Sequence, residues 1–161
     1  MSESFESKLM RWKFNFFPAY RASGARLTYV SSDFLEMRMK LRLTRATRNY
    51  VGTLFGGSMY ASVDPIYMMI LIKVLGPEYV VWDKAATIRF KKPGKTTLCA
   101  RFIIDKSELA VIKSELNTQH SIDRIYNVDL TDEAGVIHAS VEKVVYIRRK
   151  DHGKQNMIRQ V

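Results

Sequence analysis

Gly56, Gly57 and Asp64 are the residues whose type and spacing point most directly to chemistry. The two glycines open a long apolar run, and Asp64 lies eight positions after Gly56 within it. If the run is a helix, its first turn presents unpaired backbone N–H groups and a partial positive charge, which together can stabilise a developing oxyanion. The carboxylate of Asp64 can act as a general base on water or as a nucleophile. The structural alternatives are glycines needed for a tight turn or for close packing, and an Asp that is held by a nearby Arg or tolerated at a kink.

The spacing constrains how these residues can act together. Eight helical residues span ~12 Å, so Gly56 and Asp64 of one chain cannot both touch one reacting carbonyl group. A shared site would combine Gly56 and Gly57 of one subunit with Asp64 of its partner, which predicts a homodimer, or a tetramer built from dimers. Pro65 lacks a backbone N–H and leaves the carbonyl of Ala61 free, which predicts a kink beside Asp64.

Two helices are expected to position these residues. The first covers residues 4–17, ends at Pro18 and carries apolar side chains at helical spacing, namely Phe5, Leu9, Trp12 and Phe16. The second extends from about Gly57 to Leu75, where Gly76 and Pro77 stop it. Because this second helix is apolar nearly all round, we expect it to be buried on most sides.

Alternating apolar and polar residues indicate an antiparallel sheet around that helix. Residues 107–116 fit either a short helix or a broadened strand, and Gly135 supplies a positive φ for a hairpin turn. Strands are expected over residues 26–33, 34–43, 79–82, 85–91, 97–105, 122–131 and 136–148. The order predicts one α+β domain over residues 1–161, with a helical segment over 1–20 and a flexible tail over 149–161.

The motifs around the second helix resemble a known family. The matching residues are Asn49, Gly52-Thr53, Phe55 to Ser58, Asp64-Pro65 and Val81 to Ala86. They resemble a bacterial hotdog domain of unknown function, which is classed with acyl-CoA thioesterases of the phenylacetate-pathway type. The resemblance covers roughly residues 10–150. It implies a hotdog fold, in which a curved antiparallel sheet wraps one long apolar helix, and hydrolysis of an acyl thioester by water.

The resemblance also implies roles for particular residues. In the thioesterases an Asn, a Gly and a His-Gly-Gly precede the helix, and an acidic residue lies at the offset of Asp64. The implied catalytic residues are Asp64, Gly57 and Asn49, and the implied substrate-binding residues are Gly56, Phe55, Thr53 and Ser58. Phe55 stands where many thioesterases have His, and the three histidines lie elsewhere, at His120, His138 and His152. No metal or resident cofactor is implied, because coenzyme A enters as part of the substrate.

Several alternatives remain open at this stage. Asn49 could hold water or the thioester oxygen, or it could be a loop residue. Thr53 and Ser58 fit helix caps better than nucleophiles, because no His in the motif would activate Ser58. With Phe55 in place of His, the protein could instead bind an acyl group or acyl-CoA without hydrolysing it.

Composition narrows the class of protein and its surroundings. The 161 residues are 47% hydrophobic, which predicts a globular fold. The lone Cys99 fits a reducing, cytoplasmic compartment and excludes a zinc site built on several thiolates. The net charge of +10 attracts polyanions in general, and basic groups could bind the phosphates of coenzyme A. No nucleic-acid motif is present, and the apolar run is short and charged for a membrane span, so neither partner is expected.

Overall fold

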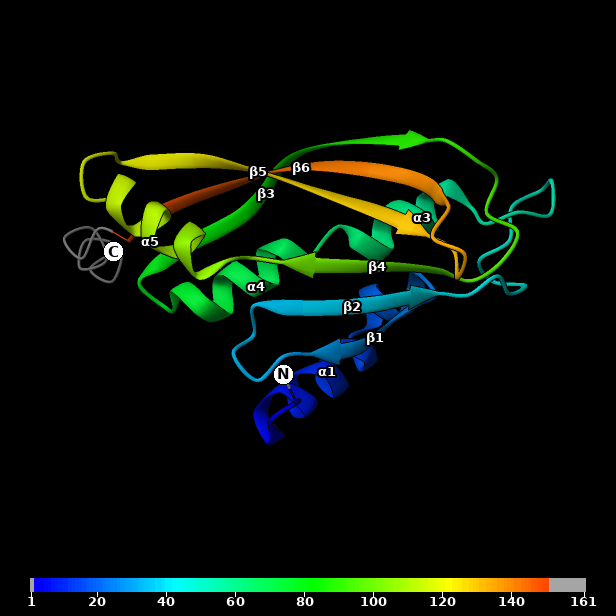
Figure 1. Cartoon of the computed structure of the whole chain (residues 1–161), viewed down its shortest axis with the longest axis horizontal. Coiled ribbons are helices and arrows are strands. Elements are labelled where there is room, and N and C mark those ends of the chain that lie inside the picture. The colour runs from blue at the N-terminus through cyan, green and yellow to red at the C-terminus, as the bar shows by residue number, and fades with distance from the viewer. Residues whose placement is uncertain (1, 151–161) are drawn as a thin grey trace, which may run out of the picture.

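The computed structural model describes residues 2–150 and forms a curved six-stranded antiparallel sheet in the order β1-β2-β4-β5-β6-β3 (Figure 1). The strands are β1 (Ala25–Val30), β2 (Glu36–Leu41), β3 (Tyr79–Phe90), β4 (Leu98–Ile103), β5 (Ser121–Thr131) and β6 (Ile137–Arg149). The helices are α1 (Phe5–Phe16), α2 (Pro18–Ala22), α3 (Gly56–Val63), α4 (Ile66–Leu75) and α5 (Lys106–Glu115). The α+β fold class is confirmed. The expected tail began at residue 149, but Arg149 belongs to β6, and residues 151–161 lie outside the described residues.

The expected central helix is divided in two at Asp64 and Pro65. Pro65 cannot donate to the carbonyl of Ala61, so α3 ends at this point, and α4 restarts with a 2.9 Å bond from the Met69 N–H to the Pro65 carbonyl. The break confirms the predicted kink. The residues that face the sheet are fully buried on both sides of the break, namely Val63, Ile66, Ile70 and Leu71.

The expectation that this helix is buried on most sides is wrong for its outward face. Met68 and Met69 are half-buried and Ile72 is exposed, because the sheet covers one side of α4 and leaves the other open. Among the described residues, Gly56–Leu75 is the one helical segment long and apolar enough to cross a membrane by length and composition. A core helix satisfies the same criteria, and half of this segment is buried in the fold.

The structure corrects the predictions for strand β3 and for Pro18, and it decides between the two alternatives for residues 107–116. Residues 79–82 and 85–91 form one strand, β3, in which a bulge between Asp83 and Ala85 shifts the register against β6. Pro18 ends α1 but also begins α2, where its fixed φ suits a first helical turn. The ambiguous segment forms helix α5.

Helix α1 and the residues just before it make polar contacts with the outer edge of β1. The Asn15 side chain accepts from the Leu27 N–H at 2.8 Å and donates to the Leu27 carbonyl at 2.9 Å. The Glu3 carboxylate accepts from the Val30 N–H at 3.0 Å. These bonds satisfy backbone groups that an edge strand would otherwise leave open. The opposite edge of the sheet is β3, which pairs with β6 on one side only.

A carboxylate held by two arginines joins β2 to β4 and gives a testable pKa. Glu36 accepts from Arg101 at 2.7 and 3.0 Å and from Arg38 at 2.6 Å. The hydrogen bond from Arg101, ahead of that from Arg38, lowers the pKa of Glu36 to about 2. We expect NMR titration to find Glu36 ionised until about pH 2. Its contribution to stability is therefore present above its usual pKa of 4.5 and is lost as the pH falls toward 2.

Two arginine substitutions serve as the test and the control for this titration, one at Glu36 and one away from it. Arg101→Met should move the Glu36 pKa back toward its usual value, whereas replacing the exposed Arg89 by Met should leave it unchanged. An unaltered titration in the Arg101 variant would contradict the assignment.

Candidate functional site

The start of α3 presents unpaired backbone donors. Phe55 is its N-cap and has no side-chain capping bond, and the first intrahelical bond runs from the Met59 N–H to the Phe55 carbonyl at 3.0 Å. The N–H groups of Gly56, Gly57 and Ser58 therefore have no acceptor among the described residues. A helix start of this kind favours negative charge.

Both glycines allow aromatic rings to pack closely at this helix start. A Cβ atom on Gly57 would overlap the ring of Phe55, and one on Gly56 would lie 2.9 Å from the ring of Phe90. Phe55, which occupies the position of the His in many thioesterases, is more than half exposed. An aromatic face therefore lies beside the free N–H groups, at the position where many thioesterases have His.

Asn49, Thr53 and Gly56 are brought together around a cavity of about 430 Å³, where Lys91 and Lys92 also contribute to the lining. The Asn49 side chain organises the loop before α3. Its Oδ1 accepts from the N–H groups of Thr53 and Val51, and its Nδ2 donates to the Thr53 hydroxyl at 2.9 Å. This pattern is typical of a loop-forming Asn. Ser58 is buried in the first turn of the helix.

Asp64 lies at the other end of α3, within a charged cluster formed by Asp64, Tyr60, Lys143 and Asp83. The Tyr60 hydroxyl donates to Asp64 Oδ1 at 2.7 Å, and Lys143 Nζ donates to the same oxygen at 2.5 Å. Asp64 Oδ2 consequently has no partner among the described residues. The Asp64 side chain is 38% exposed, so this free oxygen belongs to an accessible carboxylate.

Sequence reasoning missed both Asp83 and Lys143 of this cluster, and the more deeply buried of the two is Lys143. Its side chain is 1% exposed, and its Nζ lies 3.2 Å from Asp83 Oδ1 as well as beside Asp64. Burial alone would lower the pKa of Lys143, but the hydrogen bond to Asp64 and the charges of Asp83 and Asp64 outweigh it and raise the pKa above its usual value. The ammonium group therefore stays charged inside the fold.

The charge of Lys143 affects the hydrogen bonding and the pKa values of its neighbours Asp83 and Tyr60. Asp83 Oδ1 is buried and has no hydrogen bond in the described residues, so its 3.2 Å approach to Lys143 is an ion pair without hydrogen-bond geometry. Burial raises the pKa of Asp83, although Lys143 partly offsets this rise. Burial, followed by the bond to Asp64, raises the pKa of Tyr60, which keeps the phenol protonated and able to donate.

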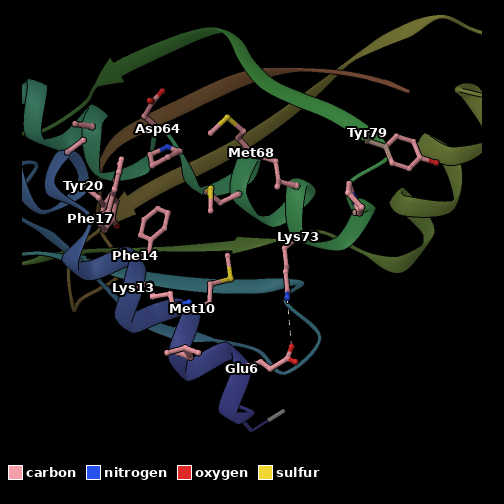
Figure 2. Close-up of a pocket in the computed structure, with 18 of the residues that line it drawn as sticks. Glu6, Met10, Lys13, Phe14, Phe17, Tyr20, Asp64, Met68, Lys73 and Tyr79 are labelled. Atoms are coloured by element: carbon pink, nitrogen blue, oxygen red, sulfur yellow. Dashed lines mark ion pairs between the residues drawn. The ribbon is translucent and has the colours of Figure 1, made fainter. Parts of the chain in front are cut away.

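An apolar groove of about 1300 Å³ runs between α1 and the outward face of α4, and Asp64 belongs to its lining (Figure 2). Helix α2 is tied to α3 by a 3.2 Å bond from the Tyr20 hydroxyl to the Ser62 carbonyl, and Glu6 of α1 pairs with Lys73 of α4 at 3.8 Å. The apolar lining includes Leu9, Met10, Phe14, Met68, Met69 and Ile72.

The predicted site residues thus fall into two groups within one chain. Asn49, Thr53, Phe55, Gly56, Gly57 and Ser58 surround the start of α3, whereas Asp64 caps its end. His138 belongs to neither group, because its ring nitrogens are engaged by Pro93 and Asp132 at 3.1 and 3.0 Å. Within residues 2–150 no three His, Cys, Asp or Glu side chains are grouped so as to hold a metal.

A curved antiparallel sheet around a central helix, with a glycine-rich helix start and an acidic residue further along, is the hotdog fold. The chain belongs to the family of the domain of unknown function DUF4442, which matches residues 6–147. No curated protein matches it in sequence.

Solved structures show the same architecture at low sequence identity. A probable thioesterase from Pseudomonas aeruginosa has a TM-score of 0.77 and 18% identity, over 93% of this chain and 99% of that one. A protein of unknown function from Chlorobaculum tepidum has a TM-score of 0.73 and 14% identity, over 90% and 95%. A thioesterase from Haemophilus influenzae has a TM-score of 0.69 and 13% identity, over 94% and 97%.

Proposed function

We propose that this protein is an acyl-CoA thioesterase that hydrolyses an acyl thioester with water at a site shared by two subunits. The observation that carries the proposal is the free Oδ2 of Asp64, an accessible carboxylate whose other oxygen is fixed by Tyr60 and Lys143. The names of the solved relatives in Pseudomonas aeruginosa and Haemophilus influenzae support the same class of reaction.

In the proposed reaction Asp64 Oδ2 accepts a proton from water while the water oxygen attacks the thioester carbonyl carbon. The carbonyl oxygen becomes an oxyanion, which is stabilised by the N–H groups of Gly57 and Ser58 at a helix start. When the tetrahedral intermediate collapses, the carbon–sulfur bond breaks. The departing thiolate takes the proton from Asp64, so acid and thiol are released and the carboxylate is restored.

The positions of β3 residues support a composite site. Asp83 of β3 shares Lys143 with Asp64, and Phe90 of β3 lies against Gly56. A second copy that pairs antiparallel with the open edge of β3, centred on Ala86 or Thr87, would place Asp83 within one residue of the copy's Phe90. That pairing would bring Asp64 of one subunit close to the start of α3 in the other.

The groove between α1 and α4 suits the acyl part of the substrate. It extends along α4 from Asp64 to Gly76, ~18 Å at 1.5 Å per residue, and its lining is mainly apolar. Met68 and Met69 are flexible side chains that adapt to an acyl chain. We therefore propose a long acyl group as the substrate.

The test is the hydrolysis of butyryl-, octanoyl- and palmitoyl-CoA, in which a thiol reagent measures the coenzyme A that is released. We expect turnover to increase with chain length. Absence of turnover on every substrate would contradict the proposed activity.

A second candidate function is acyl-CoA binding without hydrolysis. It is favoured by Phe55, because an aromatic side chain beside the helix start can contact an acyl group but cannot transfer a proton. Calorimetry separates the two candidates, since tight binding of palmitoyl-CoA without release of thiol would support the binding protein.

Mixing two inactive variants tests the composite site. Asp64→Asn removes one half of each site, and Gly57→Trp blocks the other half with a side chain that overlaps Phe55. Each variant alone should be inactive, but a mixed dimer carries both changes in one site and neither in the other. After subunit exchange an equal mixture should recover about a quarter of the wild-type turnover. No recovery, with mixed dimers confirmed by native mass spectrometry, would place both halves in one subunit.

A further inference from the structure

The aromatic side of α1 faces solvent in the folded chain. Phe5 is 81% exposed, Trp12 58% and Phe16 55%, and the exposed residues Leu9 and Phe17 continue the same surface. We call these five residues the α1 stripe. Four of them recur at the helical spacing seen in the sequence, so one side of the helix is almost entirely apolar. Solvent-exposed apolar patches of this kind mark interaction surfaces.

The stripe is not needed to attach α1 to the fold. The opposite side of the helix makes that attachment, through Phe14, which packs on Tyr20, and through the bonds of Asn15 and Glu3 to β1. The stripe is therefore available to contact another molecule or a lipid surface. Figure 1 shows α1 at the β1 end of the sheet, and β3 forms the other end of the strand order.

Basic side chains flank the stripe. Lys8 and Lys13 of α1 and Arg21 of α2 are exposed, and none of them has an ion-pair partner among residues 2–150. The one acidic residue within α1, Glu6, pairs with Lys73. The charge of this surface agrees with the +10 of the whole chain. An exposed row of Trp, Phe and Leu with unpaired Lys and Arg beside it has the chemistry of a helix that lies in the interface of an anionic bilayer.

We propose that the α1 stripe docks this protein on an anionic lipid surface, with Phe5, Trp12 and Phe16 in the headgroup region and the basic residues on the lipid phosphates. A second copy of the chain fits this surface less well, because two such surfaces would bring Lys8, Lys13 and Arg21 against groups of the same sign. This contact is peripheral, so it differs from the membrane span that the sequence argues against.

Docking has a consequence for the groove beside α4. Leu9 and Phe17 belong both to the stripe and to the lining of the groove, so the groove would open at the lipid surface. An acyl chain could then reach the groove without crossing water. This consequence rests on the proposed function, whereas the docking itself does not.

Fluorescence of Trp12 tests the docking. The chain has two tryptophans, so Trp82→Phe leaves Trp12 as the sole reporter. Titration with phosphatidylcholine vesicles that contain phosphatidylserine should shift the Trp12 emission to the blue, and bromine-labelled lipid should quench it. Pure phosphatidylcholine vesicles should bind far more weakly, and added salt should weaken binding to the anionic vesicles.

Two matched variants distinguish binding through the stripe from non-specific hydrophobic binding to vesicles. In the Trp82→Phe background, Phe5→Ser with Phe16→Ser should weaken vesicle binding by at least about tenfold, because both side chains would leave the headgroup region. Tyr50→Ser removes a fully exposed aromatic side chain elsewhere and should leave binding unchanged. Since all three positions are exposed, thermal unfolding should be alike in these variants.

Two outcomes would overturn the proposal. The first is absence of binding to anionic vesicles at low salt, or binding that the Phe5 and Phe16 changes do not weaken. The second is a Trp12 shift that rises with protein concentration without vesicles, together with a loss of self-association in the double variant. That result would assign the stripe to a second copy. Neither outcome depends on thioesterase turnover, which is measured separately.

Discussion

Replacement of Asp64 by Asn should lower kcat for acyl-CoA hydrolysis by about 10²–10⁴-fold, the range expected when a general base is lost. An amide keeps the size of the side chain and can still accept from Tyr60, but its free end cannot take a proton from water. The binding of acyl-CoA, measured by calorimetry, should change little because Asn has the size of Asp and keeps the shape of the groove. The fall should therefore appear in kcat rather than in KM.

Two other aspartates provide controls for this change. Asp123 also accepts from a lysine at 2.5 Å, through Lys84, but both side chains are exposed and lie outside the groove. Asp123→Asn should leave turnover intact. Asp83→Asn changes the second carboxylate beside Lys143 without removing Asp64 Oδ2. Turnover that survives in Asp64→Asn and is lost in Asp83→Asn would transfer the catalytic role to Asp83.

Replacement of Lys143 by Met should lower the free energy of unfolding at pH 7 by about 3–5 kcal/mol, the usual cost of removing one partner of a buried ion pair. The ammonium group is almost completely buried and is the cation paired with both Asp64 and Asp83. Without it, two carboxylates face each other and the buried Asp83 Oδ1 has no positive charge near it. Urea denaturation followed by circular dichroism measures the change.

The pH dependence of this variant identifies the cause of the loss. Burial already raises the pKa of Asp83, and removal of Lys143 should raise it further. A raised pKa in the folded state means that the folded chain binds the proton at a higher pH than the unfolded chain. The destabilisation should therefore be greatest at pH 7 and should diminish as the pH falls through the raised pKa.

Two further variants test the same explanation. Lys84→Met breaks an ion pair of equal length at the surface and should cost about 1 kcal/mol or less. Asp83→Asn should restore part of the stability when it is added to Lys143→Met. Equal losses in the Lys84 and Lys143 variants, or a loss that does not change with pH, would show that the charge of Lys143 is not what the fold requires.

Much of the fold could be predicted from local signals in the sequence. Gly76-Pro77 and Pro65 interrupt the apolar helix where the structure ends or breaks it, because a proline has no N–H to continue the backbone bonds. Gly135 adopts the positive φ expected in the last hairpin. The prediction of two strands in place of β3 was wrong. A bulge at Lys84 changes the alternation of side chains without ending the strand.

The candidate site was only partly predictable, for a physical reason. Asp64 and the two glycines carry signals of their own, but Lys143, the charged partner of Asp64, lies 79 positions away on strand β6. One signal was present and unused. Val141, Lys143, Val145 and Ile147 alternate along β6 and are all buried, so a lysine stands where the pattern calls for an apolar side chain. The outward direction of the α1 stripe also depends on tertiary packing, because helical spacing does not say which side meets the sheet.

The bonds from Asn15 and Glu3 to β1 determine how far the sheet can extend from one molecule to the next. In a filament with a continuous sheet, each subunit must pair with one neighbour through each of its two sheet edges. Within residues 2–150, α1 covers the first edge, and only the edge at β3 is left open. If two chains join through β3, each uses its last open edge in doing so, and growth stops at a pair. The same few polar contacts that attach a helix to the domain would thus also limit its assembly and keep a twelve-residue edge strand from seeding fibres.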